Sequence, residues 1–499
     1  MPEMKHSISH PPLTFYPLLS VLSVATLLLS IIYFDAYRYD VLAYHAPFTA
    51  LATKISSLRD FELEEFLYNR FLGFPPTWRY ALYPGLILNS PRLLILPNLV
   101  ALMILVYACK SIIKLSVPLS IASVISYPII LYAFRSAYQD FFVGALVTAS
   151  LFFTLSLVVN FRRSCWFWTT ATLILASTTK YQGLIQALAV IGIGYLFLLT
   201  RFLSAVFRYQ PKHHSLKGML FLTVSLLLVL IHPTLNWLIH SNPFFPVEVA
   251  GFDGPEFNYT EAQTYTQLFW PLHSFFNHIS SATELDWLFR GVVPNYSIDQ
   301  HASQAQYGGI LDPISIKSLI RSGGTFSPFY FSIALPYVFI VFGEWRKLFT
   351  LRSMPAFRQL VCGASIFSIL VAFMPQSHEL RYYLSSLMVP SIITTRAIFL
   401  IPVIRSYLAF MLSIFFVFAM TVNFIQPIKT TLEGYLSTGR LGYLYQYPSR
   451  DLPTRDYCLS HGSVSADQKT GFLKLNTGTA FACRIVLRGE ENFYIYNIK

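Results

Sequence analysis

The sequence has few charged residues and lacks the motifs by which many soluble enzymes are recognised. Only 12% of its 499 residues are charged, about half of the roughly 25% found in soluble domains. It contains no HExxH, CxxC, Walker-type phosphate loop or glycine-rich dinucleotide motif, so metalloprotease, redox and ATPase functions lack their usual signals. It also contains no internal repeat, which leaves an inverted-repeat transporter without support.

Apolar residues dominate the chain. Hydrophobic residues make up 54% and aromatic residues 16% of the sequence, and the mean hydropathy is +0.52. Apolar runs long enough to cross a bilayer as a helix recur about eleven times. They lie at residues 15–34, 93–109, 117–134, 141–159, 165–179, 184–200, 219–238, 326–342, 360–374, 384–403 and 407–425. The sequence therefore predicts an all-α, polytopic membrane protein.

Basic residues are unevenly divided between the two sides that these runs define. If the N-terminus is cytoplasmic, the inner segments hold fifteen lysines and arginines, whereas the short outer loops hold only Arg135, Lys180 and Arg381. This is the positive-inside pattern of a membrane protein. Nearly all carboxylates fall outside, with Glu3 and Glu344 as the exceptions. The net charge of +12 is therefore interpreted as a topology signal, and nucleic acid is not an expected partner.

Two long polar loops lie on the outer side of the predicted membrane domain. The loop at 35–92 contains a predicted surface helix at 43–58, an acidic patch, and a proline-rich aromatic turn, GFPPTWRY, at 73–80. The loop at 240–325 is rich in aromatic residues, asparagine, glutamine and glycine.

The C-terminal tail has a different composition from the membrane domain, residues 1–425. Residues 426–499 contain turns and short alternating stretches such as ACRIVL and NFYIYNI, which are typical of strands. We predict a small extracytoplasmic cap of β or α/β structure. Cys458 and Cys483 lie in this tail and could form a disulfide outside the cytoplasm.

The stretch FDAYRYDVLAYHAP, residues 34–47, follows the first apolar run and carries Asp35, Asp40, Tyr44 and His45. If a helix restarts here, Asp40 and Tyr44 share a face, because residues four apart stack on one side of a helix. A carboxylate at the mouth of a helix bundle can act as a general base or bind an ion. The structural alternative is an aspartate that caps a helix.

Two more charged residues stand at outer ends of spans. Arg135 and Asp140 bracket the short loop RSAYQD. Asp140 either forms a surface pair with Arg135 or is a second carboxylate that converges on Asp40 or on a divalent cation bound to phosphate. Lys180 lies in STTKYQGL, between two apolar runs. It either anchors the membrane interface or neutralises a lipid-linked phosphate as a point charge.

The segment QSHELRYYL brings the chain back into the membrane and contains His378, Glu379, Arg381 and Tyr382. The guanidinium of Arg381 can hold a phosphate through its planar fork, or it can pair with Glu379. His378 is more typical of an interface histidine than of a metal ligand. A further segment, SNPFFP at 241–246, begins with an Asn-Pro pair that favours a turn.

In this order, the motifs resemble the GT-C superfamily of integral membrane glycosyltransferases, which includes protein O-mannosyltransferases, the aminoarabinose transferase of lipid A and oligosaccharyltransferases. The resemblance covers roughly residues 15–400 and is nearest to uncharacterised bacterial members. It rests on YDVLAYHAPF, on Asp140 at the start of the fourth span, and on TKYQGL, SNPFFP and LRYYLSSLMVP.

The resemblance implies transfer of a sugar from a polyprenyl-phosphate donor to a lipid, glycan or protein acceptor, on the outer face of a bacterial inner membrane and among membrane lipids. It implies Asp40 as the catalytic base, with Asp35 as the alternative. The leaving lipid phosphate needs a nearby cation, so we expect Lys180 and Arg381 to bind the donor phosphate. The expected substrate-binding residues are Tyr44, His45, Asp140, His378 and Tyr382. The resemblance assigns no definite cofactor, and a divalent cation with Asp140 as candidate ligand is left open.

Two other functional classes fit a polytopic chain of this composition. A lipid-linked oligosaccharide flippase, or a polymerase or ligase of surface polysaccharide, would also be basic inside and carry large outer loops. A flippase, however, predicts cationic residues along a central cavity, whereas the charges here cluster at outer ends. A non-catalytic scaffold predicts that Asp40, Asp140, Lys180 and Arg381 do not converge.

Overall fold

The computed structural model describes about half of the chain, mainly its N-terminal half. The described residues are 15–34, 45–54, 65–88, 90–159, 162–207, 213–247, 356–372 and 384–399, with single positions between 252 and 428. Helices account for 86% of them, and no strand occurs among them, in agreement with the predicted all-α class. The predicted C-terminal cap, apart from position 428, lies outside the described residues.

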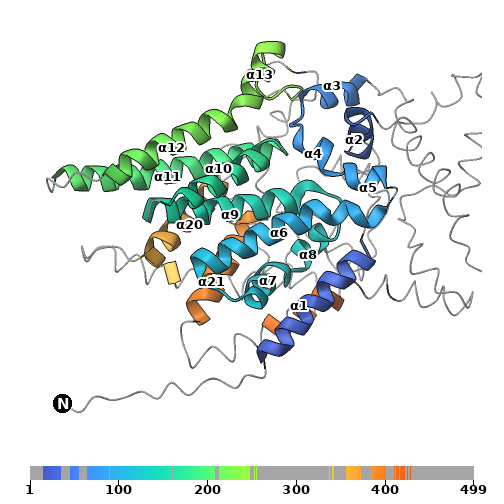
Figure 1. The fold of residues 1–499 in the computed structure, drawn as a ribbon, viewed down its shortest axis with the longest axis horizontal. Coiled ribbons are helices and arrows are strands. Elements are labelled where there is room, and N and C mark those ends of the chain that lie inside the picture. Colours follow the sequence, from blue (N-terminus) through green and yellow to red (C-terminus); the bar gives the residue numbers. More distant parts are fainter. Residues whose placement is uncertain are drawn as a thin grey trace, which may run out of the picture.

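The centre of the fold is the helix α9 (Gln139–Val159), almost all of whose residues are buried. Around it lie α6 (Leu96–Ala108), α10 (Arg163–Ser177), α11 (Tyr181–Phe207) and α20 (Ala356–Ala372). Helices α12 (His213–Val229) and α21 (Ser385–Phe399) also pack on α9. Figure 1 shows most of these helices running along one common direction, which we call the bundle axis.

Four helical segments are long and apolar enough to cross a membrane: Arg92–Ile113, Gln139–Val159, Tyr181–Ser204 and Ser215–His240. They coincide with the apolar runs that the sequence places at 93–109, 141–159, 184–200 and 219–238. The runs at 15–34, 360–374 and 384–403 are occupied by the shorter apolar helices α1 (Phe15–Ile32), α20 and α21. The run at 326–342 lies largely outside the described residues, and about half of the run at 407–425 is described, including the short apolar helix Leu412–Thr421. The total number of spans therefore stays a prediction.

The apolar run at 117–134 is not one continuous helix. It forms α7 (Val117–Ile125) and α8 (Pro128–Phe134), with Tyr127 between them in an extended conformation. The cause is Pro128, because a proline disfavours the helical conformation in the residue before it. The buried side-chain amide of Asn98 donates to the carbonyl of Phe134, the last residue of α8, at 3.0 Å and to that of Ser136 at 2.9 Å. Polar backbone groups that are shielded from water are satisfied in this way.

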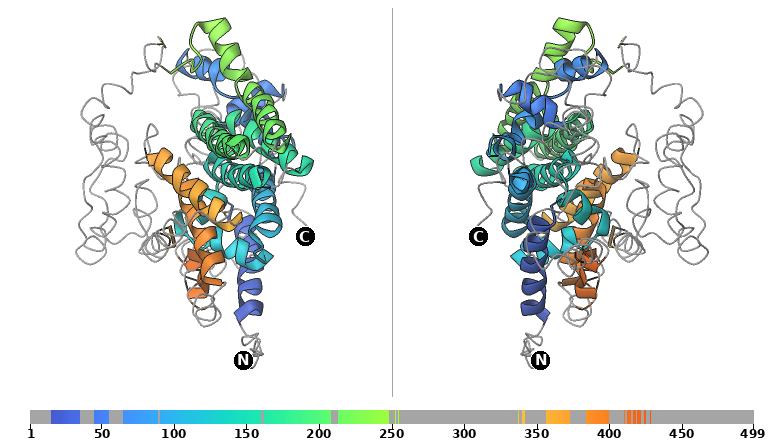
Figure 2. Two further views of the ribbon diagram at one scale, coloured as in Figure 1. Left: turned by 90° about the vertical axis from the view of Figure 1, so that its left-hand side faces the viewer. Right: turned by 90° about the vertical axis from the view of Figure 1, so that its right-hand side faces the viewer.

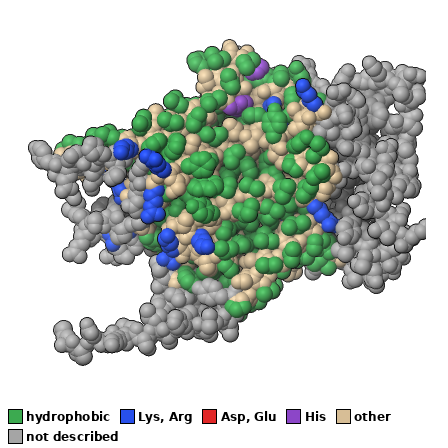
Figure 3. All heavy atoms as spheres, viewed as in Figure 1, with side chains coloured by type: hydrophobic (Ala, Val, Ile, Leu, Met, Phe, Trp, Pro, Cys, Tyr) green, Lys and Arg blue, Asp and Glu red, His purple; other side chains and the backbone are tan. Residues whose placement is uncertain are grey.

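Short helices gather at one end of the bundle (Figure 1). They are α2 (Ala46–Ala52), α3 (Glu65–Gly73), α4 (Thr77–Ala81), α5 (Tyr83–Ile87) and the 3-10 helix η3 (Pro91–Ile95). The surface helix predicted at 43–58 is therefore shorter, and it is not on the surface, because residues 46–50 are buried. Figure 3 shows that lysine and arginine side chains on the visible face gather mostly at the opposite end of the bundle.

Candidate functional site

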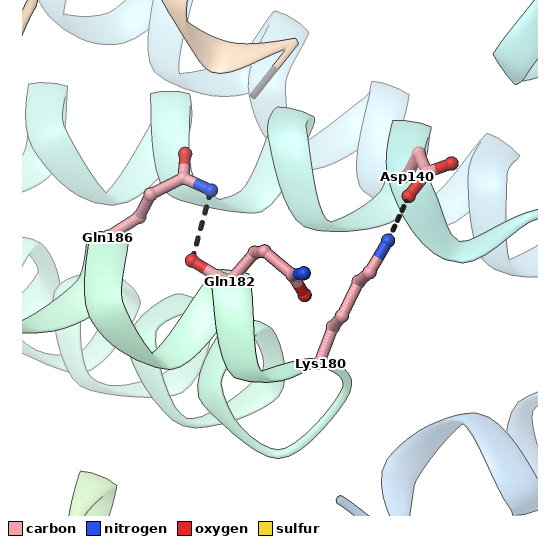
Figure 4. A network of polar contacts seen from close by, with 4 residues as sticks. All are labelled: Asp140, Lys180, Gln182 and Gln186. Atoms are coloured by element: carbon pink, nitrogen blue, oxygen red, sulfur yellow. Dashed lines mark hydrogen bonds and ion pairs between the residues drawn. The ribbon is translucent and has the colours of Figure 1, made fainter. Parts of the chain in front are cut away.

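An ion pair between Asp140 and Lys180 lies at the end of the bundle that carries the short helices. Asp140 is in the first turn of α9, where the helix dipole favours a carboxylate. Lys180 immediately precedes α11, and its Nζ lies 2.6 Å from Asp140 Oδ1 (Figure 4). The two side chains are only 14% and 9% exposed. Residues 40 positions apart in the chain are thus held together in a largely buried pair.

Asp140 does not form the surface pair with Arg135 that the sequence left as an alternative. Among the described residues, its ion-pair partner is Lys180. Arg135 is itself buried; its guanidinium donates to the carbonyl of Tyr33 at 3.4 Å and lies 5.4 Å from the centre of the Phe424 ring. The loop between α8 and α9 is therefore part of the protein interior, not a surface turn.

His45 lies at the same end and is buried. The centroids of its ring and of the Trp78 indole lie 6.2 Å apart in an edge-on arrangement. Trp78 in turn packs against Phe142, two residues after Asp140. Burial, reinforced by the positive charges of Lys180 and Arg70, lowers the pKa of His45 to about 3. His45 is therefore neutral at physiological pH, and it lies within the electrostatic field of Lys180.

The carbonyl of Gly73 joins three helices at this end. It accepts hydrogen bonds from the Tyr181 hydroxyl at 2.8 Å and from the Asn236 amide at 2.9 Å. His232 Nε2 lies 3.1 Å from the same oxygen and donates to it when the proton is on that nitrogen. The Tyr181 hydroxyl is also 2.6 Å from the carbonyl of Phe245. We call these five residues the Gly73 clasp.

The clasp joins two turns that the sequence singled out in its predicted outer loops. Gly73 begins GFPPTWRY, and Phe245 lies in SNPFFP, which is a turn in the structure. Within this turn, the Asn242 side chain accepts from the Phe244 N–H at 2.7 Å and donates to the Val247 carbonyl at 2.9 Å. Asparagine favours turns through such local bonds. Tyr181, which follows Lys180 directly, thus connects the candidate site to both outer turns.

A second connection ties the GFPPTWRY turn to the hairpin that carries Lys180. The Thr77 N–H donates to the carbonyl of Thr178 at 2.8 Å, and the two hydroxyls lie 2.7 Å apart. Arg79 holds the turn closed, since its guanidinium donates to the Phe74 carbonyl at 2.5 Å and lies over the Phe71 ring. The backbone on either side of Lys180 is therefore fixed.

The N-terminus of α21 packs beside the ion pair. Gly144, one turn after Asp140, lies so close to α21 that a Cβ atom there would be 2.9 Å from Leu384 Cβ and 3.3 Å from the Ser385 nitrogen. The Ser385 hydroxyl donates to Oε1 of Gln186 on α11. Gln186 in turn donates to the Gln182 carbonyl at 3.0 Å (Figure 4).

The remaining predicted site residues lie outside the described residues. These are Asp35, Asp40, Tyr44, His378, Arg381 and Tyr382. Of the residues that the sequence proposes, the structure brings together Asp140, Lys180 and His45.

Sequence reasoning missed most of the clasp. Tyr181 and Gly73 stand inside segments that were singled out, but no role was assigned to either. His232 and Asn236 were overlooked because they lie in an apolar run that was assigned as a span. Their signal was available, since two polar side chains four positions apart in IHPTLNWLIH share one helix face.

The described residues do not fit a divalent cation site at Asp140. No group of three or more histidine, cysteine, aspartate or glutamate side chains comes together among them. Oδ1 of Asp140 accepts a hydrogen bond from the ammonium group of Lys180. The positive charge of this group would repel a cation at the same oxygen. Asp140 is therefore best described as the partner of Lys180.

Neither a family model, nor a curated protein, nor a solved structure matches the chain. The structure itself defines the class: a mostly helical chain with four helices that are long and apolar enough to cross a membrane.

Proposed function

We propose that this protein is a membrane glycosyltransferase that moves a sugar from a polyprenyl-phosphate donor to a hydroxyl of a lipid, glycan or protein acceptor. The main support is the convergence of Asp140, Lys180 and His45 at one end of the helix bundle. A site at a bundle end suits a lipid-linked donor, whose chain lies among the spans while its phosphate stays at the interface.

Lys180 is the proposed contact to the donor phosphate. Its ammonium is held by Asp140 in a position that is shielded but still 14% exposed. The leaving group of the reaction is a lipid phosphate, which is already a stable anion, so it needs a nearby cation and not a proton. We assign Asp140 a positioning role, which is to orient the Lys180 ammonium, and we propose Arg381 as a second cation.

Asp40 is the proposed base, with Asp35 as the alternative. An acceptor hydroxyl is a weak nucleophile at neutral pH, and a carboxylate within hydrogen-bond reach can take its proton. The acceptor oxygen then bonds to the anomeric carbon while the bond from that carbon to the phosphate oxygen breaks, and the electron pair leaves with the phosphate. One direct displacement inverts the anomeric carbon. Neutral His45, with Tyr44, would contact the sugar by hydrogen bonds and not by charge.

The same proposal places the site on the periplasmic or exterior side of a bacterial inner membrane. The basic side chains visible in Figure 3 gather mostly at the other end of the bundle, and basic residues favour the cytoplasmic side. Substrates at the outer face would be lipid-linked sugars, since nucleotide sugars are made in the cytoplasm.

The proposal is tested by reconstituting the purified protein in liposomes with radiolabelled polyprenyl-phosphate sugars and with envelope lipid, glycan and protein fractions as acceptors. We expect Asp40→Asn to abolish transfer. We expect Lys180→Ala to raise the apparent donor KM by roughly 10- to 100-fold, because a hydrogen bond to a charged group contributes about 1.5–3 kcal/mol. The matched control is Lys217→Ala, an exposed lysine near the start of α12, which leaves transfer unchanged.

Two results would count against this assignment. Undiminished transfer by Asp40→Asn removes that residue from the role of base. An unchanged donor KM in Lys180→Ala removes the phosphate contact, even if overall transfer falls.

A further inference from the structure

The last apolar run before the second outer loop is bent. The sequence predicts one span at 219–238, but α12 ends at Val229 and a separate helix, α13 (Ile231–His240), follows. Figures 1 and 2 both show α13 turning across the bundle axis at the end where the short helices gather. Pro233 explains the position of the bend, because it lacks an N–H and its ring clashes with the carbonyl four residues earlier, that of Val229.

One face of α13 is fixed to the protein. Pro233 and Asn236 are buried, and Asn236 donates to the Gly73 carbonyl and to the Tyr181 hydroxyl, both at 2.9 Å. The ring of His240, at the end of α13, stacks on Phe245 with centroids 3.8 Å apart. His232, Asn236 and His240 on α13 therefore contact residues of the Gly73 clasp, whereas Thr234 is exposed.

The opposite face of α13 is apolar and exposed. Ile231, Leu235 and Leu238 are 50%, 49% and 73% exposed, and their spacing of four and three residues places them in one stripe. Trp237 flanks the stripe and is 58% exposed. The stripe continues the exposed apolar face of α12, which carries Leu216, Leu220 and Leu227. That face belongs to a segment apolar enough to cross a membrane, so its natural neighbour is lipid.

We propose that α13 does not cross the membrane but lies along its outer interface, with the bilayer as the partner of the Ile231–Leu235–Leu238 stripe. Amphipathic helices lie in this way with their apolar face in the boundary between headgroups and acyl chains. Tryptophan favours the headgroup level. Through Asn236, the interface then sets the depth at which the Gly73 clasp and the GFPPTWRY turn are held. This inference does not depend on the proposed enzymatic activity.

The test is a depth measurement with spin labels in liposomes of phosphatidylethanolamine and phosphatidylglycerol. Single cysteines replace Ile231, Leu235 and Leu238, and a control series replaces Leu216, Leu220 and Leu227. The parent full-length chain carries Cys458→Ser and Cys483→Ser, because its other cysteines are buried. Relative accessibility to oxygen and to a water-soluble nickel chelate reports the depth of each label.

We expect the three α13 labels to report one depth, because a helix in the membrane plane keeps one stripe at one level. The α12 labels should change depth progressively, by up to about 1.5 Å per residue. A continued span instead predicts that depth changes by about 10 Å from residue 231 to residue 238, and that result would overturn the proposal. Labels that neither reagent reaches would also overturn it, since a protein partner would then cover the stripe. If one variant fails to fold, Ile239 takes its place, since it is exposed on the same side.

Discussion

Replacing Gly73 by alanine perturbs the clasp without removing any hydrogen-bonding group. A Cβ atom at Gly73 would overlap the carbonyl oxygen of Phe245, and its next contacts are the carbonyl carbon and the ring of the same residue. The oxygen belongs to the backbone, so the turn that carries Phe245 must move away from α3. The Tyr181 hydroxyl now lies 2.8 Å from the Gly73 carbonyl and 2.6 Å from that of Phe245, and it cannot stay close to both once they separate.

The cost of Gly73→Ala follows from these contacts. Forcing an extra methyl group into a packed region costs about 1–3 kcal/mol. Each hydrogen bond lost from the clasp adds about 1 kcal/mol, and the Tyr181 and Asn236 contacts to Phe245 are the ones at risk. We therefore expect the variant to be destabilised by about 2–5 kcal/mol.

Thermal unfolding in detergent, in a parent chain with Cys458→Ser and Cys483→Ser, measures this effect through the remaining cysteines. Cys109, Cys165 and Cys362 are buried, so a maleimide that becomes fluorescent on reaction reports their exposure as the protein unfolds. The matched control is Gly192→Ala on α11, where an added Cβ meets no heavy atom within 4 Å. Alanine is the better helix former, so the control melts at or slightly above the wild-type temperature.

The reasoning fails if Gly73→Ala unfolds at the same temperature as the wild type. It also fails if Gly192→Ala is destabilised as strongly, because the loss would then be a general effect of replacing glycine. A lower melting temperature confined to the Gly73 variant supports a clasp whose packing leaves no room for a methyl group.

Two further predictions concern His45 and Asn98. His45 has a pKa of about 3 in the folded protein and about 6.5 when unfolded, so between these values the unfolded chain binds more protons and stability falls as the pH is lowered. The slope is about 1.4 kcal/mol per pH unit well below pH 6.5; tryptophan-fluorescence melts at pH 7 and pH 5 measure it, and His45→Gln should reduce the difference. Replacing Asn98 by leucine leaves the Phe134 and Ser136 carbonyls without this donor, which should destabilise the protein by about 1–3 kcal/mol; an unchanged melting temperature would show that the bonds contribute little.

The sequence predicted those parts of the fold that follow from apolar composition. The central helix α9 and the segments 92–113 and 181–204 match the predicted runs closely, because a long run of apolar residues has few alternatives to a helix in a bilayer. The run at 117–134 is interrupted at Pro128. The run at 219–238 lies in a segment, 215–240, that is long and apolar enough to cross a membrane, but this segment is broken at Leu230, near Pro233. Both prolines were visible, but a proline inside an apolar run leads either to a kink or to two helices, and packing decides between them.

The candidate site was predictable only in part. Asp140 and Lys180 could be placed on one side of the membrane by counting spans, but their direct pairing depends on how α9 and α11 pack. The choice of Lys180 over Arg135 could not be read from spacing, because Arg135 is nearer in sequence and turns into the interior instead. The contacts of the Gly73 clasp could not be predicted for a similar reason, since the sequence does not show what the backbone carbonyl of a glycine will bind.

The central claim is that Lys180 and its neighbours lie on the outer face of the membrane, opposite the basic end of the bundle. The direct test is cysteine labelling with a membrane-impermeant maleimide in intact and permeabilised spheroplasts, in a chain with Cys458→Ser and Cys483→Ser. Tyr80→Cys reports the site, because Tyr80 is 57% exposed on α4 and the same helix is bonded to Thr178; Lys217→Cys reports the opposite end. We predict that residue 80 is labelled in intact spheroplasts and residue 217 only after permeabilisation; labelling of both from one side, or the reverse order, would contradict the account.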